Sequence, residues 1–174
     1  MSRFKIVLIG DGGVGKSAFV ARHVSDTFST SYGPTLGVDV QSVTFNTSYG
    51  QIVFDLWDTA GQEKFSGMRD GYYIGANAAI VMFDVGSLLS RKNIKTWIDL
   101  YTKIAPNTPV FVCGSKIDAV MNRVASSSSI VLTLQARGID CAYGELSAKI
   151  NHNCRSPFLW LARKLAGHDD LVFV

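Results

Sequence analysis

Eight residues near the N-terminus, Gly10 to Ser17, constrain the fold more than any other part of the chain. They read Gly-Asp-Gly-Gly-Val-Gly-Lys-Ser and match the phosphate-loop pattern G-x-x-x-x-G-K-S/T at every fixed position. The four glycines allow the backbone to turn its N–H groups inward, toward the phosphates of a nucleotide. The apolar run 3–9 before the loop predicts a strand and residues 17–24 predict a helix, so the loop ends at a helix N-terminus, which attracts anions.

The pattern gives most residues of this loop a role. Lys16 is expected to reach the β- and γ-phosphates, and the Ser17 hydroxyl is expected to bind a magnesium ion. A glycine-rich turn that binds nothing is the alternative, and the strand and helix on either side argue against it. The residues expected to surround the phosphates are Gly10, Asp11, Gly12, Gly13, Val14, Gly15, Lys16, Ser17 and Ala18.

Six apolar or β-rich runs predict the strands of one sheet. The first two runs after the loop flank residues 46–50 and predict an antiparallel hairpin. The continuous apolar runs of the second half are typical of parallel strands that are buried on both faces. The expected strands are residues 3–9, 37–45, 51–57, 78–84, 109–114 and 141–146.

Helical signals alternate with these strands. The strongest belongs to the last helix, with Ser156 as its expected cap, Pro157 as its first residue and Gly167 as its end. The serine run 126–129 is expected to be an exposed loop or a helix edge. The other expected helices are residues 17–24, 64–73, 88–104 and 119–125. This alternation predicts an α/β domain of the P-loop NTPase class, with a mixed, mostly parallel six-stranded sheet flanked by helices.

The composition is that of a single soluble globular domain over residues 1–174, with 47% apolar and 18% charged residues. The net charge of +3 is small and the basic residues are scattered, so direct nucleic-acid binding is not expected. Neither a signal peptide nor a lipidation motif is recognised at the ends, and we expect no membrane anchor. The three cysteines lack metal-type spacing and indicate reduced thiols in a cytosolic or nuclear compartment.

Asp58 stands at the end of the strand expected over 51–57. A carboxylate there can hold Mg²⁺ through water, whereas a lone Asp at a strand end is more often a turn residue. The phosphate loop and the following Thr59-Ala60-Gly61-Gln62 favour the magnesium role. Gly61 offers an N–H to a γ-phosphate, and the Gln62 amide can orient an attacking water.

Two later segments also follow expected strands and suit a guanine base. Asp118 can accept hydrogen bonds from N1–H and the 2-amino group of guanine, a donor pattern that adenine lacks. Lys116 can lay its alkyl stem along the purine ring, and a backbone N–H of residues 147–149 can reach the guanine carbonyl oxygen. Each signal alone is weak, because a Lys-x-Asp turn is usually a solvated charged turn. The residues expected at the base are Ser115, Lys116, Asp118, Ser147, Ala148 and Lys149.

These four segments, in this order and each at the end of a strand, resemble those of the small GTPases of the Ras superfamily. The resemblance covers Lys5 to Ala166. Within the superfamily the chain looks most like the Ran branch, the GTPases of nuclear transport. The stretches that carry this second likeness are 35–38, 57–65, 69–74 and 157–165.

The resemblance implies a switch that binds GTP or GDP with Mg²⁺ and hydrolyses GTP slowly unless an activating protein assists. It implies that Phe28 packs edge-on against the guanine, that Tyr32 also lies at the nucleotide, and that Phe65 inserts into the factor that returns the GDP form to the nucleus. Phe28 and Phe65 could instead be ordinary core aromatics. The implied catalytic residues are Lys16, Gly61 and Gln62, and the implied magnesium ligands are Ser17, Thr35 and Asp58.

The same resemblance implies the partners and the location. The partners would be importin-β-type transport receptors, a guanine-nucleotide exchange factor and a GTPase-activating protein. The chain would act as a monomer in the nucleus and the cytoplasm.

Three differences from the family pattern limit these expectations. Ser115 stands where the family has Asn, so we expect one lost buried hydrogen bond, worth about 1–2 kcal/mol, and faster nucleotide release. Residues 124–138 carry Arg137 alone where Ran proteins have a basic patch. The acidic C-terminal extension of Ran proteins is not present before the chain stops at Val174.

Two alternatives remain open from the sequence. A membrane-trafficking GTPase of the Rab or Rho kind would share the nucleotide segments but would be expected to carry terminal cysteines for a lipid anchor. A degenerate GTPase that keeps GDP as a structural ligand is favoured only by Ser115, since the other expected phosphate and magnesium residues are present.

Overall fold

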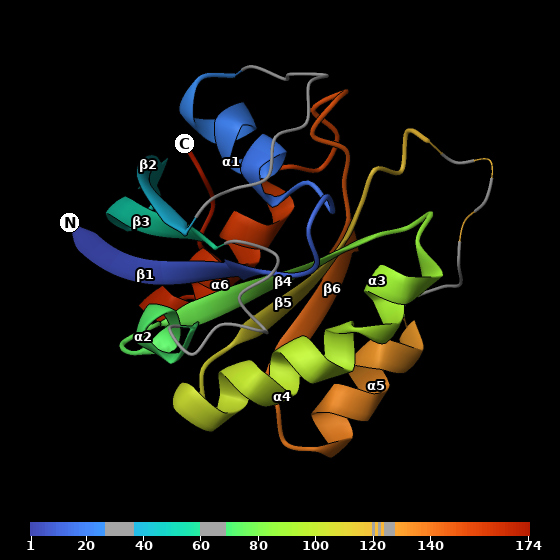
Figure 1. The fold of residues 1–174 in the computed structure, drawn as a ribbon. Helices are drawn as coiled ribbons and strands as arrows, with labels where there is room; N and C mark the ends of the chain where they lie inside the picture. Colours follow the sequence, from blue (N-terminus) through green and yellow to red (C-terminus); the bar gives the residue numbers. More distant parts are fainter. Residues whose placement is uncertain (27–36, 60–68, 120, 122, 124–127) are drawn as a thin grey trace.

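A six-stranded sheet forms the centre of the computed structural model, which describes residues 1–26, 37–59, 69–119, 121, 123 and 128–174 (Figure 1). The strands lie in the order β2-β3-β1-β4-β5-β6, and each neighbouring pair is parallel except β2 with β3. All the expected strands are found, so the predicted α/β class with a mixed, mostly parallel sheet is confirmed. The strands are β1 (Ser2–Ile9), β2 (Val38–Thr47), β3 (Gly50–Thr59), β4 (Ala78–Asp84), β5 (Val110–Ser115) and β6 (Cys141–Glu145).

The hairpin of β2 and β3 turns more tightly than the sequence predicts. Thr47 pairs with Gly50, so Ser48 and Tyr49 alone form the turn in place of the expected loop at 46–50. The Thr47 hydroxyl donates to the carbonyl of Gly50 (2.6 Å) and accepts from the N–H of Tyr49 (3.1 Å). Gly50 has a φ of 102°, a conformation that costs glycine little. These contacts replace the looser loop with a two-residue turn.

Helices cover both faces of the sheet (Figure 1). On one face, α1 and α6 bury Phe19 and Phe158 in a single apolar cluster with β2 and β3. On the other face, α2, α4 and α5 bury Tyr73, Trp97 and Leu134 in a second cluster with β4 and β5. The helices are α1 (Lys16–Val24), α2 (Arg69–Tyr73), α3 (Leu88–Lys92), α4 (Ile94–Ile104), α5 (Ser128–Ala136) and α6 (Ser156–Ala166).

The single helix expected over 88–104 is two helices in the structure. The Ser87 hydroxyl caps α3 by accepting from the N–H of Ser90 (3.2 Å), and Asn93 separates α3 from α4. The second of these helices turns one apolar stripe toward the core. Its buried residues are Ile94, Trp97, Ile98 and Tyr101.

The sequence misplaces the helix that precedes β6. The prediction of a helix over 119–125 is wrong where the structure describes it, because Ala119 lies in a bend and Met121 in a 3₁₀ turn. The helix is α5, which begins at Ser128 inside the serine run. Serine is a poor helix former, and α5 is stabilised by packing of Ile130, Val131 and Leu134 on the second apolar cluster.

The last helix differs from its prediction only at its first residue. Ser156 lies inside α6, and Arg155 is the N-cap, with no capping hydrogen bond from its side chain. Pro157 is the second residue of the helix and not the first, but it still lies in the first turn. Gly167 ends the helix with a φ of 72°, which confirms its predicted role.

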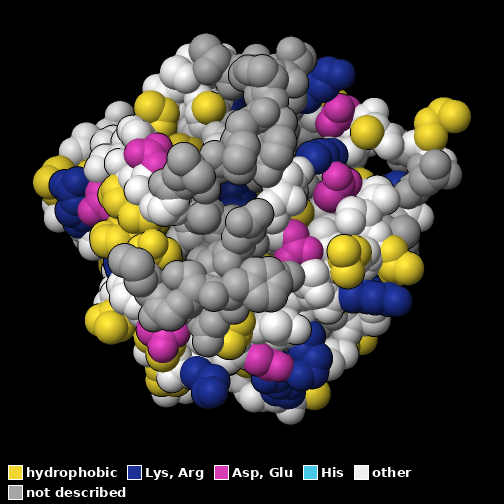
Figure 2. Space-filling model, in the orientation of Figure 1, with side chains coloured by type: hydrophobic (Ala, Val, Ile, Leu, Met, Phe, Trp, Pro, Cys, Tyr) yellow, Lys and Arg dark blue, Asp and Glu magenta, His cyan; other side chains and the backbone are white. Residues whose placement is uncertain are grey.

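Charged side chains are spread over the face drawn in Figure 2, where Lys and Arg alternate with Asp and Glu and do not form one basic patch. None of the helices within the described ranges combines the length and the apolar character that crossing a membrane would need. Cys113, Cys141 and Cys154 are buried free thiols. Burial raises the pKa of each, so none resembles a reactive thiolate.

His23 on α1 is packed inside the aromatic part of the first cluster. Its ring centroid lies 4.8 Å from that of Phe19 and 4.6 Å from that of Phe158, with edge-on geometry in both pairs. Burial lowers the pKa of His23 below its ordinary value, and the charges of Arg155 and Arg22 act in the same direction. The folded protein therefore favours the neutral imidazole.

This burial predicts a pH dependence of stability. Because the folded-state pKa lies below the unfolded one, the contribution of His23 is intact above about pH 6.5 and is lost as the pH falls from there through the folded value. Chemical denaturation between pH 8 and pH 5 should show a smaller decrease in unfolding free energy for His23→Leu than for the wild type. The exposed His152→Gln serves as the control for the loss of a histidine. An equal slope in His23→Leu and the wild type would contradict the prediction.

Candidate nucleotide-binding site

The carboxyl ends of the parallel strands bring the predicted site segments to one edge of the sheet. The phosphate loop follows β1, Asp58 lies near the end of β3, and Ser115 is the last residue of β5. Residues 147–149 come shortly after β6. In doubly wound sheets this edge is where ligands bind.

The phosphate loop is shaped by two glycines that no other residue could replace without strain. Gly10 has a φ of 148°, and a Cβ at this residue would lie 2.3 Å from the carbonyl oxygen of Met82. Gly15 has a φ of 103° and is the N-cap of α1. The Lys16 side chain is buried, with 6% exposed, and its Nζ donates to the carbonyls of Gly10 (2.7 Å) and Asp11 (3.1 Å). The backbone of the loop thus surrounds the ammonium group of Lys16. This group supplies a positive charge for phosphate oxygens.

The pair Ser17 and Asp58 fits a magnesium ion. Ser17 Oγ donates to Asp58 Oδ2 at 2.5 Å, and the Asp58 side chain is buried with 3% of the residue exposed. The other oxygen, Oδ1, is buried and has no hydrogen-bond partner among the described residues. Burial raises the pKa of Asp58, while the Ser17 hydrogen bond and the charge of Lys16 oppose that rise. A hydroxyl and a carboxylate with an oxygen in need of a partner are suitable ligands for Mg²⁺.

Ser115 and Lys116 fasten the base segment to the phosphate loop. Ser115 Oγ lies 2.5 Å from the carbonyl oxygen of Val14 and 2.9 Å from that of Phe83. Lys116 Nζ donates to the carbonyl of Gly13 (2.6 Å). Ser115 therefore still links the base segment to the phosphate loop, and the expected faster nucleotide release stays a prediction. The shorter side chain still reaches the loop, although its single proton serves only one of the two carbonyls at a time.

This link predicts the effect of Ser115→Ala. Loss of one buried hydrogen bond, worth about 1 kcal/mol, leaves the Val14 carbonyl unsatisfied and should speed nucleotide release about fivefold. Release of a fluorescent GDP analogue in stopped flow would measure it. The matched control is Ser90→Ala, which removes a buried hydroxyl that bonds within the α3 region. Equal release rates in Ser115→Ala and the wild type would show that the link does not hold the loop in its binding shape.

Asp118 is oriented by a serine from the other base segment. Ser147 Oγ donates to Asp118 Oδ1 at 2.6 Å, which joins the segments after β5 and β6. Ser147 also exchanges backbone hydrogen bonds with His152 (3.1 and 2.9 Å). The carboxylate of Asp118 is exposed at the surface of the site, where it can meet a base.

The Asp11 side chain bonds to residues near the α3–α4 junction. Its Oδ1 accepts from Trp97 Nε1 (2.8 Å) and its Oδ2 from Asn93 Nδ2 (2.6 Å), both on the α3–α4 side of the sheet. The side chain therefore anchors the phosphate loop to α4, and only the backbone of Asp11 remains for a nucleotide. Asn93, the residue that separates α3 from α4, is part of this anchor.

The structure brings together the phosphate loop, Asp58, Ser115 to Asp118 and residues 147–149. Two contacts of the site are not predicted from the sequence: the anchor of Asp11 on α4, and the bonds of Arg22 to the segment 147–149. Neither has a local sequence signal, because each contact joins residues far apart in the chain. Five predicted nucleotide residues lie outside the described residues: Phe28, Tyr32, Thr35, Gly61 and Gln62.

Comparison with models of known protein families gives a match to the Ras family over residues 5–167. The matched span contains every segment of the candidate site. It also nearly coincides with the span of the resemblance found in the sequence. The match is to the family as a whole and does not distinguish its Ran branch.

Proposed function

Because the chain belongs to the Ras family, we propose that it is a guanine-nucleotide switch of the Ran type, which regulates transport between the nucleus and the cytoplasm. The family membership itself makes the chain a small GTP-binding protein with GTPase activity. Its general ligands are GTP or GDP and Mg²⁺, and its general regulators are exchange factors and activating proteins. The assignment of individual residues and of the transport pathway is our proposal.

One observation carries the residue assignment: Ser115, at the end of β5, and the following Lys116 bond to two consecutive carbonyls of the phosphate loop, those of Val14 and Gly13. A rigid connection of this kind sets the distance between the phosphate site and Asp118. A nucleotide with a guanine base and two or three phosphates requires both ends of the site at a fixed separation. Asp118 then selects the base, and Lys16 binds the β- and γ-phosphates.

The chemistry follows from these positions. Ser17, Asp58 and Thr35 would hold Mg²⁺, which would offset negative charge on the phosphate oxygens. Gln62 orients a water for in-line attack on the γ-phosphate, and the N–H of Gly61 binds a γ-phosphate oxygen. Lys16 stabilises the charge that develops as the terminal phosphate leaves. In this proposal Thr35 and Gly61 would contact the γ-phosphate, and hydrolysis would remove those contacts.

The intrinsic rate should be slow and should depend on an activating protein. An arginine that stabilises the transition state is supplied in trans in many such switches and raises the rate by up to about 10⁵-fold. The sequence of this chain offers no evident arginine that could stabilise the transition state. We therefore expect an activating protein to supply it.

Gln62→Leu tests the hydrolytic function. The variant keeps the bulk of the side chain and loses the amide, so the water is no longer oriented and single-turnover hydrolysis should slow at least about tenfold. Phosphate release from preloaded protein with Mg²⁺ measures it, and Gln51→Leu, on the exposed edge of the hairpin, is the matched control. Unchanged hydrolysis in Gln62→Leu would rule out the role given to Gln62. Absence of phosphate release from the wild type would favour a nucleotide-binding module without turnover.

The Ran-type assignment is supported by the sequence stretches 69–74 and 157–165. Each stretch also contributes to the core, since Tyr73 in the first and Phe158 in the second are wholly buried. The test is a pull-down with GTP- and GDP-loaded protein against purified importin-β-type receptors. Capture by the GTP form alone would support the assignment, and equal capture by both forms or by neither would contradict it.

A further inference from the structure

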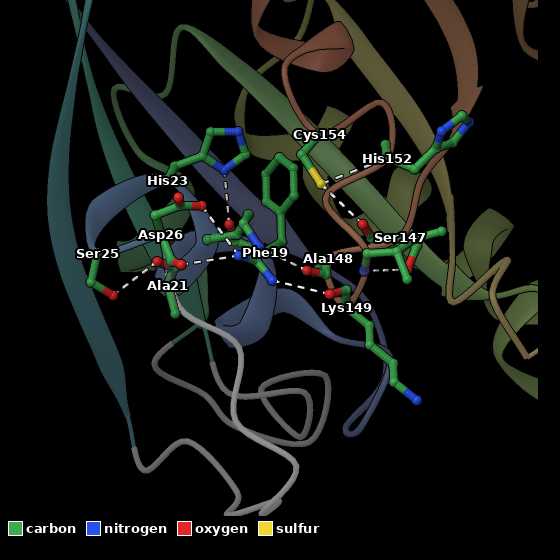
Figure 3. A network of polar contacts seen from close by, with 12 residues as sticks. Phe19, Ala21, His23, Ser25, Asp26, Ser147, Ala148, Lys149, His152 and Cys154 are labelled. Carbon is green, nitrogen blue, oxygen red and sulfur yellow. Dashed lines mark hydrogen bonds and ion pairs between the residues drawn. The ribbon is translucent and has the colours of Figure 1, made fainter.

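Arg22 lies in the last turn of α1 and its side chain is almost wholly buried, with 12% exposed. The guanidinium donates from Nε to the carbonyl of Ala148 (2.8 Å) and from Nη2 to the carbonyl of Lys149 (3.1 Å). Its third nitrogen, Nη1, donates to the backbone carbonyl of Asp26 (3.0 Å) and to its carboxylate (3.2 Å). In Figure 3 dashed lines run to the labelled residues Ala148, Lys149 and Asp26, which lie around α1.

The carbonyl of Ser147 is also bound within the protein. It accepts from the N–H of His152 (2.9 Å) and from Cys154 Sγ (3.3 Å). Three consecutive carbonyls, those of residues 147, 148 and 149, are therefore all bound by the body of the protein. This makes the segment an ordered strip of backbone.

The geometry of the peptide bond determines in which direction the N–H groups of this segment point. In a planar trans peptide the N–H points opposite to the C=O of the same unit, and the described chain has no cis peptide bonds. The Ser147 carbonyl shares its unit with the N–H of Ala148, and the Ala148 carbonyl shares its unit with the N–H of Lys149. Because both carbonyls point toward the protein body, both N–H groups point away from it.

We propose that Arg22 is a positioning residue for guanine recognition, which turns the N–H groups of Ala148 and Lys149 toward the carbonyl oxygen of the base. The inference rests on the proposed function, because it assigns a ligand to these N–H groups. Arg22 suits the task because its rigid planar guanidinium can bond two neighbouring carbonyls at once. α1 begins at Lys16, so the same helix carries the phosphate-binding lysine at one end and the support of the base segment at the other.

The pair with Asp26 is not the main role of Arg22. The Asp26 side chain is 80% exposed, and exposed ion pairs contribute little. Asp26→Ala should accordingly leave nucleotide binding near the wild-type value. The two carbonyl bonds to Ala148 and Lys149 carry the effect.

The test compares three diphosphates by competition against a fluorescent GDP analogue, in excess Mg²⁺. GDP and inosine diphosphate both carry the base carbonyl that the N–H groups would bind, whereas ADP has an amino group there. Arg22→Met keeps the aliphatic stem and removes the donors, so affinity for GDP and for inosine diphosphate should fall about tenfold, with little change for ADP. Arg22→Lys, which can reach one carbonyl, should give an intermediate loss.

Arg163→Met is the matched control. Arg163 Nε donates to the carbonyl of Leu171 (2.8 Å), a bond of the same type on α6. This variant should keep the wild-type ratio of GDP to ADP affinity even if its melting temperature falls. An unchanged ratio in Arg22→Met, or an equal loss for all three diphosphates, would overturn the inference. A wild type without preference for GDP over ADP would instead overturn the proposed function, so the two failures are distinguishable.

Discussion

Asp118→Asn should exchange the base preference of this protein from guanine to xanthine. The carboxylate accepts from both N1–H and the 2-amino group of guanine, whereas xanthine has a carbonyl in place of the amino group. An asparagine amide accepts from N1–H and donates to that carbonyl. A polar site that no longer matches its base rejects it by about 10³-fold or more, so GDP should lose affinity and xanthosine diphosphate should gain it.

The structure supports this exchange without loss of the fold. Ser147 Oγ donates to Asp118 Oδ1, and an amide oxygen in the same place can still accept that bond. Competition between the two diphosphates measures the change, with Asp140→Asn, a surface acid paired with Lys164, as the control. Loss of affinity for both bases, or retention of the guanine preference, would place base recognition elsewhere.

Lys16→Met should reduce affinity for GDP and GTP by about 100- to 1000-fold, the effect of removing a charged donor from a buried site. The ammonium is enclosed by the loop and bonds to the carbonyls of Gly10 and Asp11. Methionine matches the length of the lysine stem and leaves both carbonyls without this donor. Affinity for GMP should change little, since Lys16 is expected to contact the β- and γ-phosphates alone.

GMP therefore separates a lost phosphate contact from a collapsed loop. Equilibrium competition with GMP, GDP and GTP measures all three affinities, and Lys164→Met on α6 is the control for loss of a lysine. An equal loss for GMP and GDP would show that Lys16 acts by shaping the loop and not by binding the outer phosphates.

The sheet and the phosphate loop follow from local sequence. Apolar runs predict the strands because burial on both faces demands them, and Gly10 and Gly15 mark the turn because their φ values strain other residues. α5 could not be predicted in this way. Its serines oppose a helix locally, and only the packing of Leu134 and its neighbours stabilises it.

The connections inside the site are the part that sequence reasoning missed. Ser115 bonds to a residue 101 positions away, and Arg22 to one 126 positions away. Ser115 is one example, because family likeness predicts faster nucleotide release from the shorter side chain but does not show what that side chain contacts. The folded chain restores the link by bringing the hydroxyl within reach of the Val14 carbonyl.

These connections make the two ends of the site rigid with respect to each other. The phosphate loop is held by Ser115 and Lys116 on one side and, through Asp11, by α4 on the other. Arg22 joins α1 to the base segment 147–149. The phosphate and base ends of the site are thereby parts of one rigid unit, which reduces the ordering cost of binding a nucleotide.

Isothermal titration of nucleotide-free protein with GDP and ADP, each with Mg²⁺ and with excess chelator, tests this central claim most directly. The account predicts tight binding of GDP, at least about 10³-fold weaker binding of ADP, and a marked loss of GDP affinity when Mg²⁺ is removed. Equal affinity for the two nucleotides, or GDP binding that does not respond to Mg²⁺, would contradict it.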